Sequence, residues 1–250
     1  MDLQPVSTVD KVLDILMLFS SERTQISMTE IQDELSLSQS TAYRYIRILV
    51  DRGFLERVDS GNYRLGATLI ALSRAAHHSD RNLRLAALPS MKRIAEETRE
   101  SVSLMRLVNR RVVCIESLEG QYALRVTIEY GRTQHLHSGA SSKVLLAFTN
   151  DSQWDNLLDF PLKKLTENTI TESGPLYKHL KEIRRAGYAV SDGEIDVGAR
   201  AVAVPIMNRH DQVAAALSIE APASRMDDTV LDGYIALLQD EAQVICDLLK

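Results

Sequence analysis

The sequence is poor in cysteine and in aromatic residues, and it contains no long apolar run. Its two cysteines, Cys114 and Cys246, fit neither a CxxC motif nor a metal-ligand spacing, which excludes a disulfide scaffold and favours a reduced, cytoplasmic setting. No apolar run reaches the roughly 18 residues that a membrane helix needs. Lys11 and Asp14 interrupt the first apolar stretch, so we expect no signal peptide. Hydrophobic residues make up 45% and charged residues 25% of the 250 residues, as in ordinary globular proteins.

The chain also lacks a positive net charge, since it carries −5 at pH 7. The charges are unevenly distributed, however. Residues 1–37 carry two basic and seven acidic side chains, whereas residues 38–64 carry five arginines against three acids. An acidic protein with one local basic surface can bind DNA. The net charge alone therefore excludes no class of partner.

Capping motifs predict three helices in the first quarter of the chain. Ser7-Thr8-Val9-Asp10 begins a helix whose apolar residues have helical spacing, namely Val9, Val12, Leu16 and Phe19. Ser27-Met28-Thr29-Glu30 is a capping box for a second, short helix. Ser38 is a good N-cap for a third helix, which ends at Gly53.

The third helix has two faces of different chemistry. Its apolar face consists of Ala42, Tyr45, Ile46 and Leu49, and its polar face includes Ser40, Tyr43, Arg44, Arg47 and Asp51. Small hydrogen-bonding residues in the first turn and cations further along are typical of a helix that reads a DNA groove. The alternative is a solvated helix face with a few arginines. The candidate DNA contacts are Ser38, Gln39, Ser40, Thr41, Tyr43, Arg44, Arg47 and, on the hairpin that follows, Arg64.

Two short strands, 54–58 and 62–65, follow the third helix, and the turn residues 59–62 join them. Three helices and a β-hairpin in this order predict a winged helix-turn-helix. We therefore expect a DNA-binding domain over residues 1–66 and a linker helix over residues 67–80.

The linker helix has a narrow apolar stripe formed by Leu69, Leu72 and Ala76, with Ile70 on an adjacent line. A lone connector would leave such a stripe exposed. We expect the stripe to pair with the same helix of a second copy. The alternative is that it packs on the first helix of its own chain.

The remaining residues, 81–250, alternate between helices and strands without regular βαβ units. The patterns predict strands at 102–107, 112–116, 124–129, 200–206 and 213–219, and helices at 82–100, 141–148, 176–185 and 229–249. This order is typical of an α+β domain with a mostly antiparallel sheet.

The last two predicted strands have one bulky face and one small face. Val213, Ala215, Leu217 and Ile219 alternate with Ala214, Ala216, Ser218 and Glu220, and Val202, Val204 and Ile206 alternate with Ala201, Ala203 and Pro205. The bulky face suits a core packed against helices. The small, partly polar face leaves room either for a closely packed helix or for a ligand cavity.

Candidates for metal binding and catalysis are weak. Asp192, Glu194 and Asp196 alternate, but carboxylates in a glycine-bounded loop usually face water. His135-x-His137 has the spacing of a metal pair on a strand but lacks a third ligand. The sequence has no phosphate-binding loop and no recognisable Ser/His/Asp motif. We therefore expect no metal, no cofactor and no enzymatic activity.

One long run and three short ones carry a resemblance to a known family. The long run, from Gly187 to Ile206, is GYAVSDGEIDVGARAVAVPI, and the short runs are residues 40–44, 63–65 and 136–143. In this order they resemble the IclR family of bacterial transcriptional regulators. The resemblance implies a winged-helix DNA-binding domain, a linker helix and a GAF-like C-terminal domain over residues 81–250 that binds a small effector. It also implies a dimer or a tetramer of dimers. Members repress, activate or do both, so the sign of regulation does not carry over.

The resemblance also favours a cavity on the small face of the last strands, because Gly139 and Ala140 match the pocket segment of the family. We expect the effector to be a small organic or aromatic acid from a degradative pathway. The amides near Gly139 suit an anion, whereas Asp192 and Glu220 would repel a carboxylate unless one of them is protonated. Glu220 stands where members with a defined pocket often have a small residue. The candidate effector contacts are Arg125, Gly139, Ala140, Ser141, Ser191, Asp192, Ala201, Ser218 and Glu220.

The leading interpretation is a ligand-responsive transcription factor that binds a roughly palindromic duplex as a dimer and controls a catabolic operon. An enzyme with an accessory winged helix is the second interpretation, and it lacks a catalytic set. A winged helix used for protein assembly is the third, and it leaves the arginines of the third helix and the hairpin unexplained. A gel-shift assay against the DNA upstream of the gene separates the three.

Overall fold

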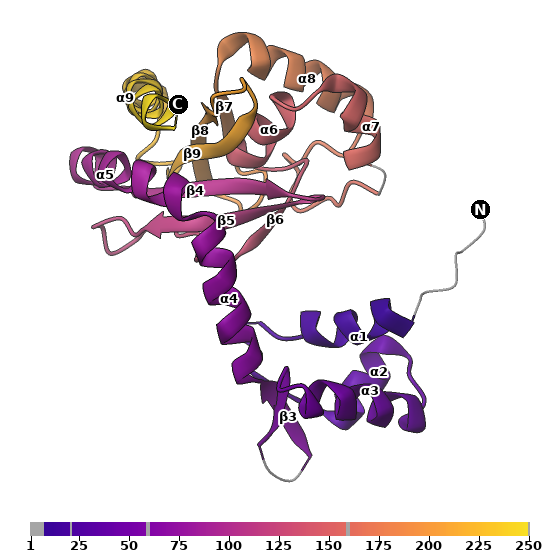
Figure 1. Ribbon diagram of the computed structural model, residues 1–250. Coiled ribbons are helices and arrows are strands. Elements are labelled where there is room, and N and C mark those ends of the chain that lie inside the picture. The colour runs from indigo at the N-terminus through magenta and orange to yellow at the C-terminus, as the bar shows by residue number, and fades with distance from the viewer. Residues whose placement is uncertain (1–7, 21, 59–60, 159–160, 250) are drawn as a thin grey trace. The chain divides into compact units, whose positions relative to one another are not determined.

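A computed structural model describes residues 8–20, 22–58, 61–158 and 161–249, and for residues 76–79 it describes the backbone alone (Figure 1). The chain divides into two compact units, Met1–Ser79 and Asp80–Lys250. Among the described helices, none is both long and apolar enough to cross a membrane.

The N-terminal unit is a winged helix-turn-helix, as the sequence predicts. It contains α1 (Thr8–Met17), β1 (Gln25–Ser27), α2 (Met28–Leu35), α3 (Gln39–Asp51), β2 (Leu55–Arg57), β3 (Asn62–Leu65) and α4 (Ala67–Ser79). The three strands form an antiparallel sheet in the order β1-β3-β2. Strand β1 was not predicted, because three residues are too few to show an alternating pattern.

The predicted N-caps are present at the starts of α2 and α3. The Ser27 hydroxyl accepts a hydrogen bond from the Glu30 amide at 3.2 Å, and the Glu30 carboxylate accepts one from the Ser27 amide at 2.7 Å. Ser36 has left-handed backbone angles (φ 50°) and ends α2, and the Ser38 hydroxyl accepts from the Thr41 amide at 3.4 Å at the start of α3. These caps fix the tight turn between α2 and α3. Ser7, the first residue of the predicted cap of α1, lies outside the described residues.

The core of this unit is formed by one face of each helix. In α3 the buried residues are Ala42, Tyr45, Ile46 and Leu49, as predicted. In α1 the buried residue is Ile15, with Val12 and Leu16 partly buried beside it. The expectation that Val9 faces the core was wrong, since 65% of its surface is exposed. Val9 lies in the first turn, beyond the reach of the core residues.

The C-terminal unit is an α+β domain, and this part of the predicted fold class is also confirmed. It contains α5 (Arg81–Thr98), β4 (Ser101–Val108), β5 (Arg111–Leu118), β6 (Thr133–His135), α6 (Ala140–Ala147), the 3-10 helix η1 (Asp151–Gln153), α7 (Trp154–Leu157), α8 (Ser173–Ala186), β7 (Ala189–Asp192), β8 (Ala199–Met207), β9 (Val213–Pro222) and α9 (Asp228–Leu248). Its six-stranded sheet has the order β6-β5-β4-β9-β8-β7, and all neighbouring strands are antiparallel.

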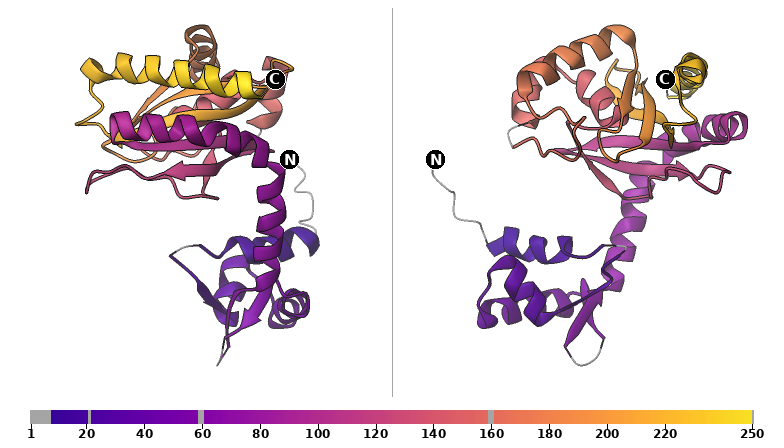
Figure 2. Two further views of the ribbon diagram at one scale, coloured as in Figure 1. Left: turned by 60° about the vertical axis from the view of Figure 1, so that its left-hand side comes forward. Right: turned by 180° about the vertical axis from the view of Figure 1, so that it is seen from behind.

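The helices of this unit cover both faces of the sheet, and each face has its own core (Figures 1 and 2). Helices α5 and α9 lie side by side on one face, where Val202, Leu217 and Ile219 point. Helix α6 packs on the other face beneath α8, against the small residues Ala203 and Ala216. The alternation along β8 and β9 thus separates the two cores as predicted.

Two details of the predicted sheet were wrong. Residues 124–129 do not form a strand, because the edge of β5 pairs with β6 instead, with Val113 opposite Thr133. Val213 packs toward the α6 face and not with Ala215 and Leu217, because the pairing of β8 with β9 shifts register between Ile206 and Met207. A bulge of this kind reverses the side that a residue faces.

Candidate functional site

The first candidate site is the exposed face of α3. Ser40, Tyr43, Arg44 and Arg47 are all exposed, and Tyr43 exposes 60% of its surface. The Arg44 guanidinium lies 5.3 Å from the centre of the Tyr45 ring, which holds it along the helix. Arg47 lies 3.8 Å from the Asp51 carboxylate, and water screens this exposed pair. Cations, an aromatic ring and small hydroxyls are the groups that contact base edges and phosphates.

The first turn of α3 divides the predicted contacts into capping and exposed residues. The Ser38 hydroxyl donates to the Thr41 hydroxyl at 2.8 Å, so these two groups bond to each other. Gln39 and Ser40 are exposed next to them. The first turn therefore combines a fixed backbone with freely accessible polar groups.

The hairpin that follows α3 brings Arg64 and Arg57 to the surface. The Arg64 guanidinium donates two hydrogen bonds to the Glu56 carboxylate, at 2.8 and 3.0 Å. These bonds, with one from the Ala67 amide, lower the pKa of Glu56. Arg57 was not predicted as a site residue, yet it borders a small hollow that it shares with Tyr43 and Arg47. The signal in the sequence was that Arg57 lies in the same predicted hairpin as Arg64.

The second candidate site is a pocket of about 300 Å³ in the C-terminal unit. It lies at the ends of β8 and β9, beyond the point where α6 covers the sheet. Its apolar lining comes from Val126, Ile128, Leu165 and Ile195, and its polar lining includes Thr127, Thr133, Gln134, Ser138, Ser141 and Ser191. Both predicted uses of the small face are therefore present, because a helix packs on Ala203 and Ala216 and a cavity opens beside Ala201.

A chain of hydroxyl groups meets Glu220 in the lining of this pocket. Strand pairing places Ser218 beside Ser103, and Glu220 beside Ala201. The hydroxyls of Ser103 and Ser218 donate to Oε1 of Glu220 at 2.7 and 2.5 Å, and Ser141 donates to Ser218 at 2.9 Å. Burial raises the pKa of Glu220 to about 7, although the two serine hydrogen bonds oppose this. Glu220 is therefore partly protonated at neutral pH.

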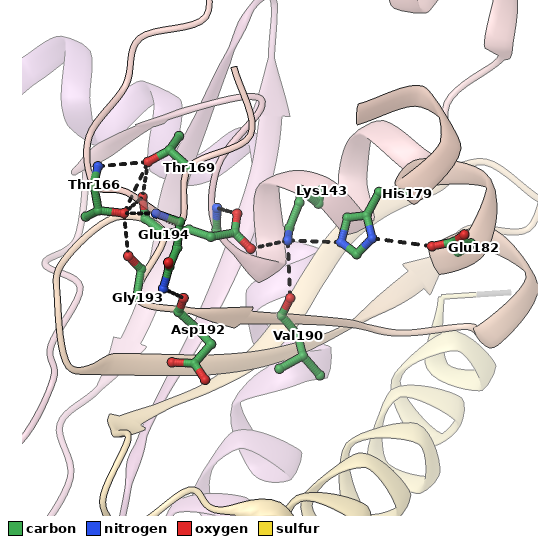
Figure 3. A network of polar contacts seen from close by, with 11 residues as sticks. Lys143, Thr166, Thr169, His179, Glu182, Val190, Asp192, Gly193 and Glu194 are labelled. Carbon is green, nitrogen blue, oxygen red and sulfur yellow. Dashed lines mark hydrogen bonds and ion pairs between the residues drawn. The ribbon is translucent and has the colours of Figure 1, made fainter. Parts of the chain in front are cut away.

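One wall of the pocket is held by a buried ion pair between Lys143 and Glu194 (Figure 3). The Lys143 ammonium also donates to the Val190 carbonyl at 3.2 Å and lies 3.2 Å from Nε2 of His179. Burial lowers the pKa of Lys143, and the Glu194 carboxylate opposes this shift. The second oxygen of Glu194 accepts from the amide of Gly139, a pocket residue, at 3.3 Å. The ion pair thus ties α6 to the loop after β7.

Two threonines hold the same loop from its other side (Figure 3). Thr169 donates to the Glu194 carbonyl at 2.7 Å, and Thr166 donates to the Gly193 carbonyl at 2.6 Å. The loop in turn places Ile195 against Gly139, so closely that a Cβ at Gly139 would lie 2.7 Å from the Ile195 side chain. Gly139 also has a φ of +87°, which other residues rarely adopt. The backbone conformation therefore favours glycine at this corner of the pocket, and any larger residue would also have to displace the end of the Ile195 side chain.

The two arginines of the pocket lining differ in their partners. Arg200 is mostly buried and donates to the Met226 carbonyl and to Asp228, both at 2.7 Å. Arg132 is exposed, and in the described parts of the chain its guanidinium has no hydrogen-bond or ion-pair partner. Burial and the nearby Arg111 lower the pKa of His135, so this lining residue adds no charge at neutral pH. Arg132 is thus available to an anionic ligand, and Arg200 also keeps one buried donor, Nε, without a hydrogen-bond partner in the described structure.

The structure brings most of the predicted effector residues together. Gly139, Ala140, Ser141, Ser191, Ala201 and Glu220 line the pocket. Ser218 is fully buried beside it, within the hydroxyl chain. Arg125 pairs with Glu119 at 2.6 Å, and Asp192 is exposed 3.7 Å from Arg200, so neither lies in the lining.

Sequence reasoning missed the pocket residues Arg132, Thr133 and Gln134. The available signal was a polar run immediately before the segment 136–143, which the resemblance had already placed at the pocket. The metal candidates also find no support, since no group of three His, Cys, Asp or Glu side chains in the described segments is placed to hold a metal ion.

Comparison with known proteins decides the family. Residues 75–247 match the family described as bacterial transcriptional regulator IclR C-terminal, and residues 8–59 match the IclR helix-turn-helix domain. The chain belongs to the IclR family. The HTH-type transcriptional regulator KdgR of Escherichia coli (strain K12) is 32% identical over 249 residues, covering 98% of this chain and 94% of KdgR. IclR relatives are DNA-binding regulators, so the prediction that this chain is a regulator and not an enzyme is confirmed.

Solved structures of IclR proteins share both units. An IclR transcriptional regulator from Silicibacter sp. TM1040 is 26% identical with a TM-score of 0.83, covering 97% of this chain and 96% of its own. An IclR homolog from Microbacterium hydrocarbonoxydans, complexed with 4-hydroxybenzoate, is 30% identical with a TM-score of 0.80, covering 97% of this chain and 99% of its own.

Proposed function

We propose that this IclR regulator is cytoplasmic, binds a roughly palindromic operator as a dimer, and controls a catabolic operon in response to a small organic or aromatic acid. One observation carries the proposal: the pocket of about 300 Å³ has an exposed arginine, Arg132, without a partner among the described residues. A cation beside an apolar cavity favours a ligand with one carboxylate and an organic body. The IclR homolog complexed with 4-hydroxybenzoate supports the same class.

The DNA contacts in this proposal are the residues predicted from the sequence. Ser40, Tyr43, Arg44 and Arg47 would face the major groove, and the first-turn residues Ser38, Gln39 and Thr41 would approach the backbone. The Arg64 guanidinium is paired with the Glu56 carboxylate, so it would contact a phosphate only if it bonds to both groups or breaks this pair. We therefore add the exposed Arg57 as a second phosphate contact of the hairpin. In this scheme residues 1–66 bind DNA, residues 67–80 link the parts, and residues 81–250 bind the effector.

The dimer contact in this proposal is the apolar side of α4. On the predicted stripe, Leu72 exposes 51% of its surface and Leu69 is partly exposed, and Ile70, on the adjacent line, exposes 63%. Two copies of this helix would cover each other and set the spacing of two DNA-binding units. Ala76, the third residue of the predicted stripe, belongs to the part of α4 whose side chains are not described.

A gel-shift titration tests the proposal. The full chain is titrated against the DNA upstream of its own gene, with and without 4-hydroxybenzoate and aliphatic acids. We expect nanomolar-range binding that one of the acids changes by roughly 5- to 150-fold, as is typical of coupling between two sites. A chain that binds no DNA, or whose DNA binding ignores every acid, contradicts the proposal.

A cavity-filling variant assigns the response to the pocket. Ala201 lies in the lining between Ser191 and Glu220, so Ala201→Phe should abolish the response to the acid while leaving DNA binding intact. Ala123→Phe, on an exposed loop outside the lining, is the matched control. A normal response by Ala201→Phe would place the effector elsewhere.

A further inference from the structure

Glu220 places an acidic side chain in the lining of a pocket that we propose binds an acid. Only 3% of its surface is exposed, and its oxygen Oε2 is buried without a hydrogen-bond partner in the described structure. Buried polar atoms nearly always have partners. The lining of the pocket holds Oε2 of Glu220, Oγ of Ser138 and Nε of Arg200 buried without one in the described structure, which calls for an explanation by function.

The neighbouring hydroxyls cannot serve Oε2. The hydroxyls of Ser103 and Ser218 lie at hydrogen-bond distance from the other oxygen, Oε1, and from each other, and the Ser141 hydroxyl donates to Ser218. Each hydroxyl has one proton, so the chain of three has none left. Free energy is lost while Oε2 lacks a partner, and a ligand that supplies one would recover it.

The charged residues of the pocket then indicate where the carboxylate of an acid effector lies. An ionised carboxylate placed beside the ionised form of Glu220, which predominates above its pKa of about 7, would be repelled at low dielectric. Arg132 attracts it at the exposed side, where the nearby Asp196 is also exposed and water screens its charge. Arg200 is engaged by Asp228 and Met226 through its two terminal nitrogens, while its Nε is buried without a hydrogen-bond partner in the described structure. The carboxylate of the effector therefore belongs beside Arg132 and Arg200, and another group of the effector meets Glu220.

We propose that Glu220 is the specificity-determining residue of the pocket and bonds a hydroxyl group of the effector, which makes the effector a hydroxylated carboxylic acid. This proposal rests on the proposed function and names the ligand class within it. A hydroxyl suits both forms of Glu220, since it donates to a carboxylate and accepts from a carboxylic acid. A cavity of about 150 Å³ holds benzene, so about 300 Å³ accommodates a substituted ring or a short hydroxylated chain.

Matched pairs of acids test the proposal by calorimetry at pH 8. The pairs are 4-hydroxybenzoate with benzoate, and 6-hydroxyhexanoate with hexanoate, each titrated into the full chain. We expect the hydroxylated member of the pair that binds to be tighter by about tenfold or more, the range of a hydrogen bond to a charged group. Terephthalate, which puts a second carboxylate at the position of the hydroxyl, should not bind the wild-type chain.

Two substitutions and one control connect this preference to Glu220. Glu220→Gln keeps the acceptor for Ser103 and Ser218 but replaces Oε2 by an amide donor, so it should lose the preference for the hydroxyl and accept terephthalate. Glu220→Ala should lose the preference as well, which covers the case that the glutamine variant misfolds. Glu119→Gln removes an equal charge at an exposed position outside the lining and should behave as wild type.

The outcomes separate this proposal from the one on which it rests. Equal affinity of the wild type for both members of a binding pair, or a preference that survives in Glu220→Gln and Glu220→Ala, overturns the role of Glu220 and leaves the acid effector in place. If no acid binds the wild type at millimolar concentration, the acid effector itself is refuted, and this proposal with it.

Discussion

Glu220 illustrates how the surroundings of one side chain decide its chemistry. A glutamate in water has a pKa near 4.5, and burial raises the pKa of Glu220 to about 7. Within the described structure, the hydrogen-bond donors beside its carboxylate are the neutral hydroxyls of Ser103 and Ser218. The folded chain therefore holds a proton at Glu220 that the unfolded chain releases at lower pH.

This difference predicts a pH-dependent stability. Because the folded-state pKa exceeds the unfolded-state value, the contribution is complete below about pH 4.5 and is lost as the pH rises through about 7. The loss amounts to about 3 kcal/mol. Glu220→Gln should remove it, so the variant should gain stability relative to wild type between pH 5 and pH 8 in urea unfolding. Parallel pH profiles of variant and wild type would contradict the assignment, and Glu119→Gln serves as the control.

Arg44 carries the sharpest residue-scale prediction for DNA. Its guanidinium is exposed and is steadied by the Tyr45 ring, so it can reach a base edge with little loss of side-chain freedom. Arg44→Ala should weaken binding to the specific operator by about 1–3 kcal/mol and relax the preference at one base pair. A salt titration of the gel shift measures this, with Arg209→Ala, in the turn between β8 and β9, as the control. Unchanged operator affinity would remove Arg44 from the site.

At the scale of elements, the buried pair of Lys143 and Glu194 joins α6 to the loop that follows β7. Loss of one partner from a buried pair leaves the other charge uncompensated, which costs about 3–5 kcal/mol. Lys143→Met should therefore lower the melting temperature markedly, and the double variant Lys143→Met with Glu194→Gln should recover part of it. Thermal unfolding of the three proteins measures the coupling. A single variant as stable as wild type would show that the pair does not hold the pocket wall.

Elements were predictable from sequence where a local rule governs them. Ser27, Glu30 and Ser38 cap their helices through contacts within four residues, and the two faces of β8 and β9 follow from alternation, except at the bulge beside Val213. Residues 124–129 have the composition of a strand but no partner, because β5 pairs with β6. Strand pairing is a long-range choice that composition does not reveal. The same limit hid Arg132, whose place at the pocket depends on that pairing.

Buried ion pairs were beyond sequence analysis for a related reason. Lys143 and Glu194 are far apart in the chain, and each is a residue type that usually lies in solvent. Only the packing of α6 against the loop brings them together. The resemblance to the IclR family pointed to elements that line a pocket in the structure, whereas the unpaired Oε2 of Glu220 became visible only with the hydroxyl chain beside it.

At the scale of the whole molecule, assembly depends on the apolar side of α4. Leu72→Glu places a charge in the proposed contact, so we expect dissociation to monomers and weaker operator binding, because two half-sites are no longer held by one particle. Sedimentation velocity and the gel shift measure these effects. Leu124→Glu changes a leucine that is more exposed (72% against 51% for Leu72) in a loop of the C-terminal unit and should leave both unchanged. A fully dimeric Leu72→Glu protein would assign the dimer contact to another surface.

The separation of two cores by a single sheet has a consequence for the descent of such regulators. Along β9, Leu217 and Ile219 stabilise the domain against α5 and α9, while Glu220 faces a cavity. A change at the cavity position leaves the neighbouring core residue and its packing untouched. A substitution that changes which compound the pocket binds therefore need not unfold the domain. A lineage that carries this sheet can acquire new chemical signals one substitution at a time, with its DNA-binding half unaltered.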